Sequence, residues 1–357
     1  MRLGPLPPIH VSGGTLVTVV LLAVIVYPGV LRAGLAPGAS AAVAGVIGLG
    51  VIVSVLVHEA AHAVTARAFG AQVDQIALTL WGGHTRYRAV SMGWGASVVV
   101  SLAGPAANAL LAGAAHLALP LSAGAPAVAV VLGYSVLLNV GLAVFNLLPG
   151  LPMDGGRAVE ALLGGLTGRR ELGTRITAWI GRGIAVLVVG LPLLRILRDP
   201  GSGSVLLLVW AVVIATTLWQ GASAALADVW ISDRVRRLDV PALTRPVAIL
   251  AGASPVTAVH AGIDPAGVLV LDERGRAGRL DPSALAAVPA DAAPSTPLRA
   301  VAGPPVPVTP VPADIGGDDL VAALVAEPRA LRLLVDAAGT PVGLVDPDDV
   351  ARALRLR

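Results

Sequence analysis

Long apolar stretches fill the first two thirds of the chain, and six of them are long enough to cross a lipid bilayer. A helix rises about 1.5 Å per residue, so about 20 apolar residues cover about 30 Å of hydrocarbon. The pattern therefore predicts six transmembrane helices at residues 14–34, 40–68, 96–118, 126–148, 177–197 and 204–227.

The connection between the second and third spans has a different pattern. The segment from Gln72 to Tyr87 does not look helical: its side chains alternate over Val73–Leu80, and the pair Gly82-Gly83 then breaks the run. Alternation with a period of two is typical of β-strands, so we expect one or two short strands beside the membrane, with an ordinary loop as the alternative. A free edge on the strand Val73–Leu80 would allow an extended peptide to pair with it.

The composition changes at about Trp230, where charged residues and prolines increase and the long apolar runs stop. Two similar segments follow, around residues 270–282 and 334–347. Each predicts a strand, a tight turn, a second strand and a helix that begins at Asp-Pro, since Pro is favoured in a first helical turn. The predicted fold is therefore a multi-pass α-helical membrane protein with a C-terminal soluble α/β region.

Composition narrows the possible functions. Of the 357 residues, 55% are hydrophobic and 13% are charged, and all basic side chains except histidine are Arg, for a net charge of +3. No run of basic residues could follow a phosphate backbone, so we expect no nucleic-acid partner. The absence of Cys excludes disulfides, thiolate metal ligands and a cysteine nucleophile.

Arginines in the connections predict the orientation of the spans. Connections on one side contain Arg67, Arg86, Arg157, Arg169 and several more, whereas those on the other side contain few. Because positive residues accumulate on the cytoplasmic side, both termini and the C-terminal region are predicted to be cytoplasmic in a bacterial cell membrane.

His58-Glu59-Ala60-Ala61-His62 lies at the end of a stretch without any charged side chain from Ala39 to Val57. A charged Asp, Lys or Arg at membrane depth costs about 2.5–3.5 kcal/mol, so ionisable groups there indicate function rather than two polar residues at a helix end. On a helix, His58 and His62 share one face and could bind one zinc ion, with Glu59 acting on metal-bound water. Asp154 at the end of the fourth span lies at the same membrane level and is the predicted third ligand.

Three blocks together resemble the site-2 proteases, which are intramembrane zinc metalloproteases. These blocks are His58-Glu59-x-x-His62, Gly104-Pro105-x-x-Asn108 and Asn146 to Gly156, although Met153 replaces the family's Leu. The resemblance implies one Zn²⁺ per subunit held by His58, His62 and Asp154, with Glu59 as the catalytic acid and base. It also implies a role for Asn146 near the scissile peptide, whereas we expect Asn108 to join helices by bonding across spans.

The C-terminal region resembles a pair of CBS modules, and the connections between spans are too short for the PDZ domains of many site-2 proteases. The resulting domains are 1–228 for the transmembrane metalloprotease, 229–288 for the first CBS-like module and 289–357 for the second. Asp349 stands where such modules contact ribose, but Asp346 replaces a hydroxyl at the phosphate position. Since a carboxylate repels phosphate, we expect a module for sensing or for homodimerisation rather than for ordinary ATP binding.

The predicted function is cleavage of a membrane-embedded regulatory protein, such as an anti-sigma factor or a sigma-factor precursor, a class implied by the resemblance. A CBS-regulated transporter or channel with a His-lined ion site is the alternative, and an inert scaffold is a third. Glu59 distinguishes the first two, because an ion site has no need of a general base between its ligands.

Overall fold

The computed structural model describes residues 8–79, 82–88, 92–199, 205–259 and 263–355. The chain divides into two compact units, Met1–Val229 and Trp230–Arg357, each of which is described separately below.

Six described helices are long and apolar enough to cross a membrane, which agrees with the six predicted spans. A 3₁₀ turn at Leu119–Ser122 extends the third of them. The six are α1 (Gly13–Arg32), α2 (Pro37–Ala68), α3 (Trp94–Ala118), α4 (Pro126–Asn146), α6 (Arg170–Arg198) and α7 (Val205–Arg236).

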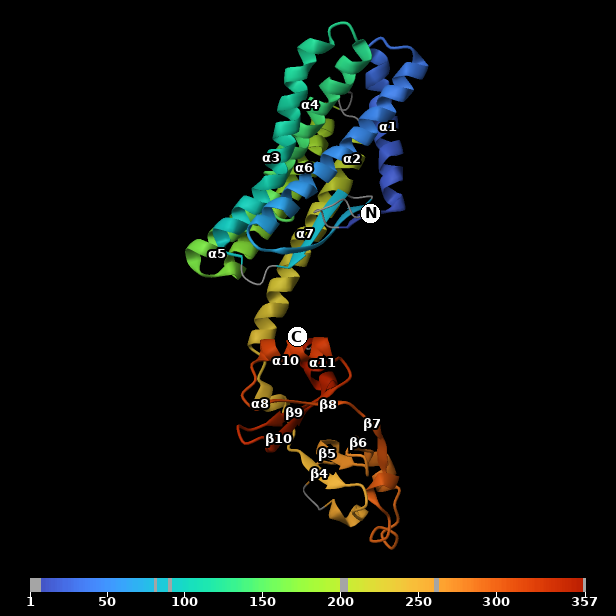
Figure 1. Cartoon of the computed structure of the whole chain (residues 1–357), viewed down its shortest axis with the longest axis vertical. Helices are drawn as coiled ribbons and strands as arrows, with labels where there is room; N and C mark the ends of the chain where they lie inside the picture. The colour runs from blue at the N-terminus through green and yellow to red at the C-terminus, as the bar shows by residue number, and fades with distance from the viewer. Residues whose placement is uncertain (1–7, 80–81, 89–91, 200–204, 260–262, 356–357) are drawn as a thin grey trace. The chain divides into compact units, whose positions relative to one another are not determined.

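Helix α2 packs against α1, α3 and α4 in the first unit (Figure 1). Val30, Val43 and Ile47 form one buried core between α1 and α2, with side chains of α4 packed against it. Large apolar side chains such as Leu16, Leu110 and Leu137 remain exposed on the outer faces of the helices. Exposed apolar faces on helices of this length are the surfaces that a bilayer covers.

The predicted bounds of several spans differ from the structure, and α6 begins at Arg170 rather than at 177. Helix α4 ends at Asn146, after which a loop leads into α5 (Asp154–Thr167), a helix that the sequence pattern did not indicate. Two Gly-Gly pairs lower the helix propensity of this segment, and contacts with α3 and α6 compensate for that cost. Helix α7 continues to Arg236 rather than ending at 227.

A three-stranded sheet lies next to α2 and consists of β1 (Ile9–Val11), β2 (Gln72–Thr79) and β3 (Gly82–Arg88). Strands β2 and β3 are the two strands predicted in the connection, whereas β1 is too short to give a pattern. Strand β1 pairs in parallel with β2, and β3 pairs with the other edge of β2. The expectation of a free edge on Val73–Leu80 is therefore wrong, since β2 is the central strand.

The second unit contains two sheets. One has the order β4-β5-β6-β7 and the other β10-β9-β8. Both predicted strand–turn–strand–helix segments are present, and Gly275 and Gly339 adopt positive φ in the two turns. The elements are α8 (Val240–Leu243), β4 (Ala248–Ala251), β5 (Val268–Leu271), β6 (Ala277–Leu280), α9 (Pro282–Ala286), β7 (Ala302–Pro305), β8 (Val308–Pro312), α10 (Gly317–Ala326), β9 (Leu331–Val335), β10 (Pro341–Val345) and α11 (Pro347–Arg355), with 3₁₀ turns at Val256–Ala258, Pro265–Gly267 and Leu298–Ala300.

The packing of this unit crosses the expected division at residue 288. Leu298 and Val301 belong to the core around Val268, and β7 completes the first sheet. Val240 instead packs into the core of the second sheet with Leu334. Each sheet therefore takes one segment from the other side of the expected boundary, because the apolar side chains of those segments find their partners there.

Candidate metal centre

Helix α2 presents His58, Glu59 and His62 to the interior of the first unit. All three side chains are buried although they lie on a helix that is otherwise almost entirely apolar. The two histidines are four residues apart, so their imidazoles lie on the same face, one turn from each other. Both imidazoles can therefore reach the same point beside the helix.

Asp154 is the first residue of α5, and the loop before it is held firmly against α6. The backbone N–H of Leu151 donates to the carbonyl of Thr177, at 3.0 Å. Gly150 lies against the backbone of Gly181, where a Cβ atom on either residue would collide. Met153 is buried against Ala185 and Leu218. These contacts fix the start of α5 and therefore the direction of the Asp154 carboxylate.

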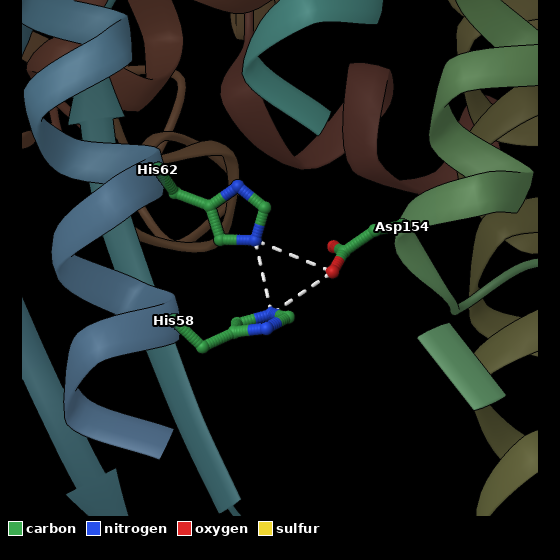
Figure 2. A group of neighbouring side chains, drawn as sticks. All are labelled: His58, His62 and Asp154. Carbon is green, nitrogen blue, oxygen red and sulfur yellow. Dashed lines mark hydrogen bonds and ion pairs between the residues drawn. The ribbon is translucent and has the colours of Figure 1, made fainter. Parts of the chain in front are cut away.

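Figure 2 shows the two imidazoles of α2 directed toward the Asp154 carboxylate, which comes from the opposite side. Asp154 Oδ2 lies 3.0 Å from His58 Nε2 and 3.2 Å from His62 Nε2, and the two Nε2 atoms are 3.1 Å apart. The structure thus brings together the three residues that the sequence predicted as metal ligands.

The other ring nitrogens determine which atoms face the centre. His62 Nδ1 lies 2.7 Å from the carbonyl oxygen of Val100, which can only accept, so Nδ1 carries the proton. His58 Nδ1 lies 2.6 Å from Asn108 Oδ1 and donates to it in the same way. Both Nε2 atoms then present lone pairs to each other and to a carboxylate.

Two lone pairs and a carboxylate at such short distances repel one another unless a cation lies between them. Atoms that each bind a tetrahedral zinc ion at about 2.0–2.1 Å are separated by about 3.3 Å, close to the observed 3.0–3.2 Å. Neutral imidazole and carboxylate are also ligands that zinc prefers. The donor atoms, their spacing and their shared tautomer therefore fit a zinc ion.

Helix α3 approaches this centre through Gly104. A Cβ atom added there would lie 2.6 Å from His58 Nε2 and closer still to His62 Nε2. Only glycine leaves room for the two imidazoles in this arrangement, which gives a physical reason for the glycine of the Gly-Pro-x-x-Asn motif.

Glu59 and Asn146 are placed differently. The Glu59 side chain packs against Gly83 of β3, where an added Cβ atom would lie 2.5 Å from Glu59 Cγ. Asn146 ends α4, and its side-chain amide donates to the carbonyl of Leu142 at 3.0 Å within the same helix. The described contacts do not bring Asn146 into the group of three.

Comparison with known proteins finds similarity to metalloproteases. Residues 121–191, which include Asp154, match the sequence model described as peptidase family M50. Sequence similarity extends further, to a candidate zinc metalloprotease of Synechocystis sp. (sll0528), with 30% identity over 51% of this chain. The chain therefore contains a segment that matches peptidase family M50, and the relatives that it resembles are described as zinc metalloproteases. This result confirms the resemblance to site-2 proteases that three motifs indicated.

Other similarities also involve about half of the chain. The candidate zinc metalloprotease Rip3 of Mycobacterium tuberculosis is 36% identical over 48% of the chain. The aligned parts cover 47% and 43% of the Synechocystis and mycobacterial proteins, so the chain matches under half the length of each. The solved site-2 protease from Methanocaldococcus jannaschii aligns with 63% of this chain and 94% of its own, at 20% identity and a TM-score of 0.43.

Two asparagines make more contacts near the site than the sequence predicted. Asn108 bonds across spans as expected, to Ser54 of α2 and Asn139 of α4, but it also contacts His58. Asn139 received no role at all. Its signal was an amide side chain in the middle of an apolar span, which is costly unless it is hydrogen-bonded.

Proposed function

We propose that the chain is an intramembrane zinc metalloendopeptidase. One observation carries the proposal: three zinc-type ligand atoms converge within a unit of membrane-spanning helices, and a buried carboxylate, Glu59, follows the first ligand directly. The comparisons support the same conclusion, because residues 121–191 match peptidase family M50 and the Synechocystis relative is described as a zinc metalloprotease.

The chain's own residues account for the reaction steps. His58, His62 and Asp154 would hold the ion, which when bound lowers the pKa of its water and polarises a carbonyl. Glu59 would accept the proton of the attacking water and return it to the leaving amine. Asn146 would donate to the developing oxyanion once its amide turns away from Leu142.

The substrate must reach these groups as an extended peptide, since a helix engages its own carbonyls in hydrogen bonds. Among the described strands, β3 has an edge that no other strand covers, whereas β2 is paired on both sides. Gly83 of β3 also touches Glu59. We therefore place substrate pairing on β3 rather than on β2.

The remaining assignments follow from sequence and family. The substrate would be a membrane-tethered regulatory protein, such as an anti-sigma factor or a sigma-factor precursor. The site would face the cytoplasm, and the C-terminal unit would be a CBS-like pair that senses a signal or joins two copies. These assignments rest on the arginine distribution and on the resemblance.

The test compares the wild type with Glu59→Gln, which retains size and polarity but removes the base. Each purified protein, loaded with zinc, is incubated with tagged single-span membrane proteins in detergent or liposomes. We expect a shortened, tagged fragment of the substrate only with the wild type, and no fragment when a chelator is present. Equal cleavage by both proteins would contradict the mechanism. Zinc-dependent ion flux that survives Glu59→Gln would support the transporter alternative instead.

A further inference from the structure

A chain of buried amides leads from His58 to helix α4. Asn108 Oδ1 contacts His58 Nδ1, and Asn108 Nδ2 donates to Asn139 Oδ1 at 2.9 Å. Asn139 Nδ2 in turn donates to the backbone carbonyl of Ser135, also at 2.9 Å. Both asparagines are almost completely buried, with exposed fractions of 0% and 2%. The three bonds connect α2, α3 and α4 through side chains inside the membrane unit.

The far end of this chain sets its direction. The carbonyl of Ser135 can only accept, so the NH₂ group of Asn139 must face it. The oxygen of Asn139 then faces Asn108 and requires the NH₂ group of Asn108 there. This leaves the oxygen of Asn108 toward His58, so that His58 Nδ1 must donate.

The alternative orientation would be harmful to a metal ligand. If the Asn108 amide were reversed, its NH₂ group would face His58 Nδ1, and the imidazole proton would move to Nε2. Nε2–H has no lone pair for a cation and would point at the Asp154 carboxylate. The direction of the Asn108 amide therefore decides whether His58 can act as a ligand.

We propose that Asn139 is a positioning residue that fixes the metal-binding tautomer of His58 through Asn108. Asn108 has a second anchor, the carbonyl of Ser54, but at 3.4 Å this bond is long. Asn139 thus supplies the shorter and stronger constraint, although it touches no ligand atom of the centre. The inference rests on the proposed zinc site and adds an indirect determinant of its affinity.

The test measures zinc binding by the full-length protein in detergent, independently of proteolysis. Asn139→Leu has a similar shape but cannot accept from Asn108, and we expect about a tenfold weaker zinc affinity, the lower end of the range for groups outside the ligand shell. Asn139→Asp restores the relay, because a buried protonated carboxyl group donates to Ser135 and accepts from Asn108. We expect its zinc affinity to be within about threefold of the wild type, well below the roughly 10–100-fold loss that follows removal of a group outside the ligand shell.

Ser122→Ala is the matched control. It removes a buried hydroxyl that donates to the carbonyl of Leu119 in the 3₁₀ turn after α3, outside the relay. Its zinc affinity should equal that of the wild type. The visible spectrum of bound Co²⁺ is a second readout, since a changed imidazole tautomer alters the ligand field whereas a general loss of stability does not.

The outcomes separate the two proposals. If the wild type binds no zinc, the proposed function and this inference both fail. If the wild type binds zinc and Asn139→Leu binds it equally well, only the inference fails. Equal losses in Asn139→Leu and Asn139→Asp, or in Asn139→Leu and Ser122→Ala, would also overturn it, because any buried polar substitution would then have the same effect. If Asn139→Leu does not fold, Asn139→Asp and the Co²⁺ spectrum still decide.

Discussion

Each of the two units contains a cluster of ionisable side chains, but the partners of the carboxylates differ between the two clusters. In the membrane unit, Asp154 faces two imidazoles whose Nδ1 protons are engaged elsewhere. In the C-terminal unit, Asp349 faces Arg245 at 2.7 Å and also Arg352. The first cluster lacks positive charge, whereas the second is neutralised by guanidinium groups. A cluster of ionisable residues is therefore a candidate for cation binding only where the protein has not supplied the counter-charge itself.

The same comparison bears on the CBS-like interpretation. Asp349 and Asp346 occupy the positions at which we expected nucleotide contacts, and Asp346 lies 2.5 Å from Arg279. A nucleotide would have to compete with these arginines for Asp349, and it would still meet the Asp346 carboxylate at the phosphate position. The contacts also connect the two sheets, since Arg245 and Arg279 both pair with carboxylates at the α11 end of the second.

The largest effect is expected from filling the metal position itself. Gly104→Ala would place a methyl group 2.6 Å from His58 Nε2 and closer to His62 Nε2. The imidazoles cannot move away without losing their bonds to Asn108 and Val100, so we expect the purified variant to retain no zinc. Metal content is measured by elemental analysis after gel filtration.

Gly113→Ala is the control for this substitution, because it lies on the same helix and an added Cβ atom would meet nothing within 4 Å. It should contain as much zinc as the wild type. Zinc retained in full by Gly104→Ala would show that the metal does not bind where the three ligand atoms converge.

A paired substitution tests the contrast between the two clusters directly. Asp154→Asn removes the anionic ligand, and we expect zinc affinity to fall by at least about 100-fold, since groups outside the ligand shell already contribute 10–100-fold. Asp349→Asn should leave zinc affinity unchanged and lower the stability of the C-terminal unit by about 1.5–3 kcal/mol, the value of a hydrogen bond to a charged group. Competition with a chromophoric chelator and calorimetric unfolding measure the two effects.

If Asp349→Asn weakened zinc binding as much as Asp154→Asn, the clusters would not be independent. If Asp154→Asn changed nothing, the carboxylate would not be a ligand, and the charge deficit of the membrane cluster would need another explanation.

The spans, and His58, His62 and Asp154 as candidate ligands, could be predicted from the sequence for a physical reason. Polar groups are so costly in lipid that their positions stand out, and helical spacing places two of them on one face. The strand pairs of the C-terminal unit could also be predicted from the sequence, because Gly275 and Gly339 mark turns that need positive φ.

Other features depend on contacts between distant segments and leave no local pattern. Strand β1 is too short to show alternation, yet it pairs with β2 and removes the expected free edge. The role of Asn139 depends on its hydrogen bond with Asn108, which lies on another helix. The close approach of Gly104 to the imidazoles likewise follows from tertiary packing, which a single helix period cannot reveal.

The smallest effect concerns the pH response of the C-terminal unit. Hydrogen bonds from Thr309 and from the buried Arg332 hold the pKa of Glu327 below its usual value. A carboxylate whose pKa is lowered by folding contributes stability above its unfolded pKa, and this contribution is lost as pH falls through the folded pKa. Glu327→Gln should therefore unfold at a slightly lower temperature than the wild type at pH 7, with the difference disappearing under acid conditions.

The measurement is the unfolding temperature of the C-terminal transition at a series of pH values, for the wild type and Glu327→Gln. Glu273→Gln is a suitable control, because it removes an acidic side chain from the turn between β5 and β6, away from Thr309 and Arg332. It should follow the wild type at every pH. If the difference in unfolding temperature between Glu327→Gln and the wild type grew as the pH fell, the predicted pH dependence would be wrong. That result would mean that Arg332 is better accommodated without its carboxylate partner.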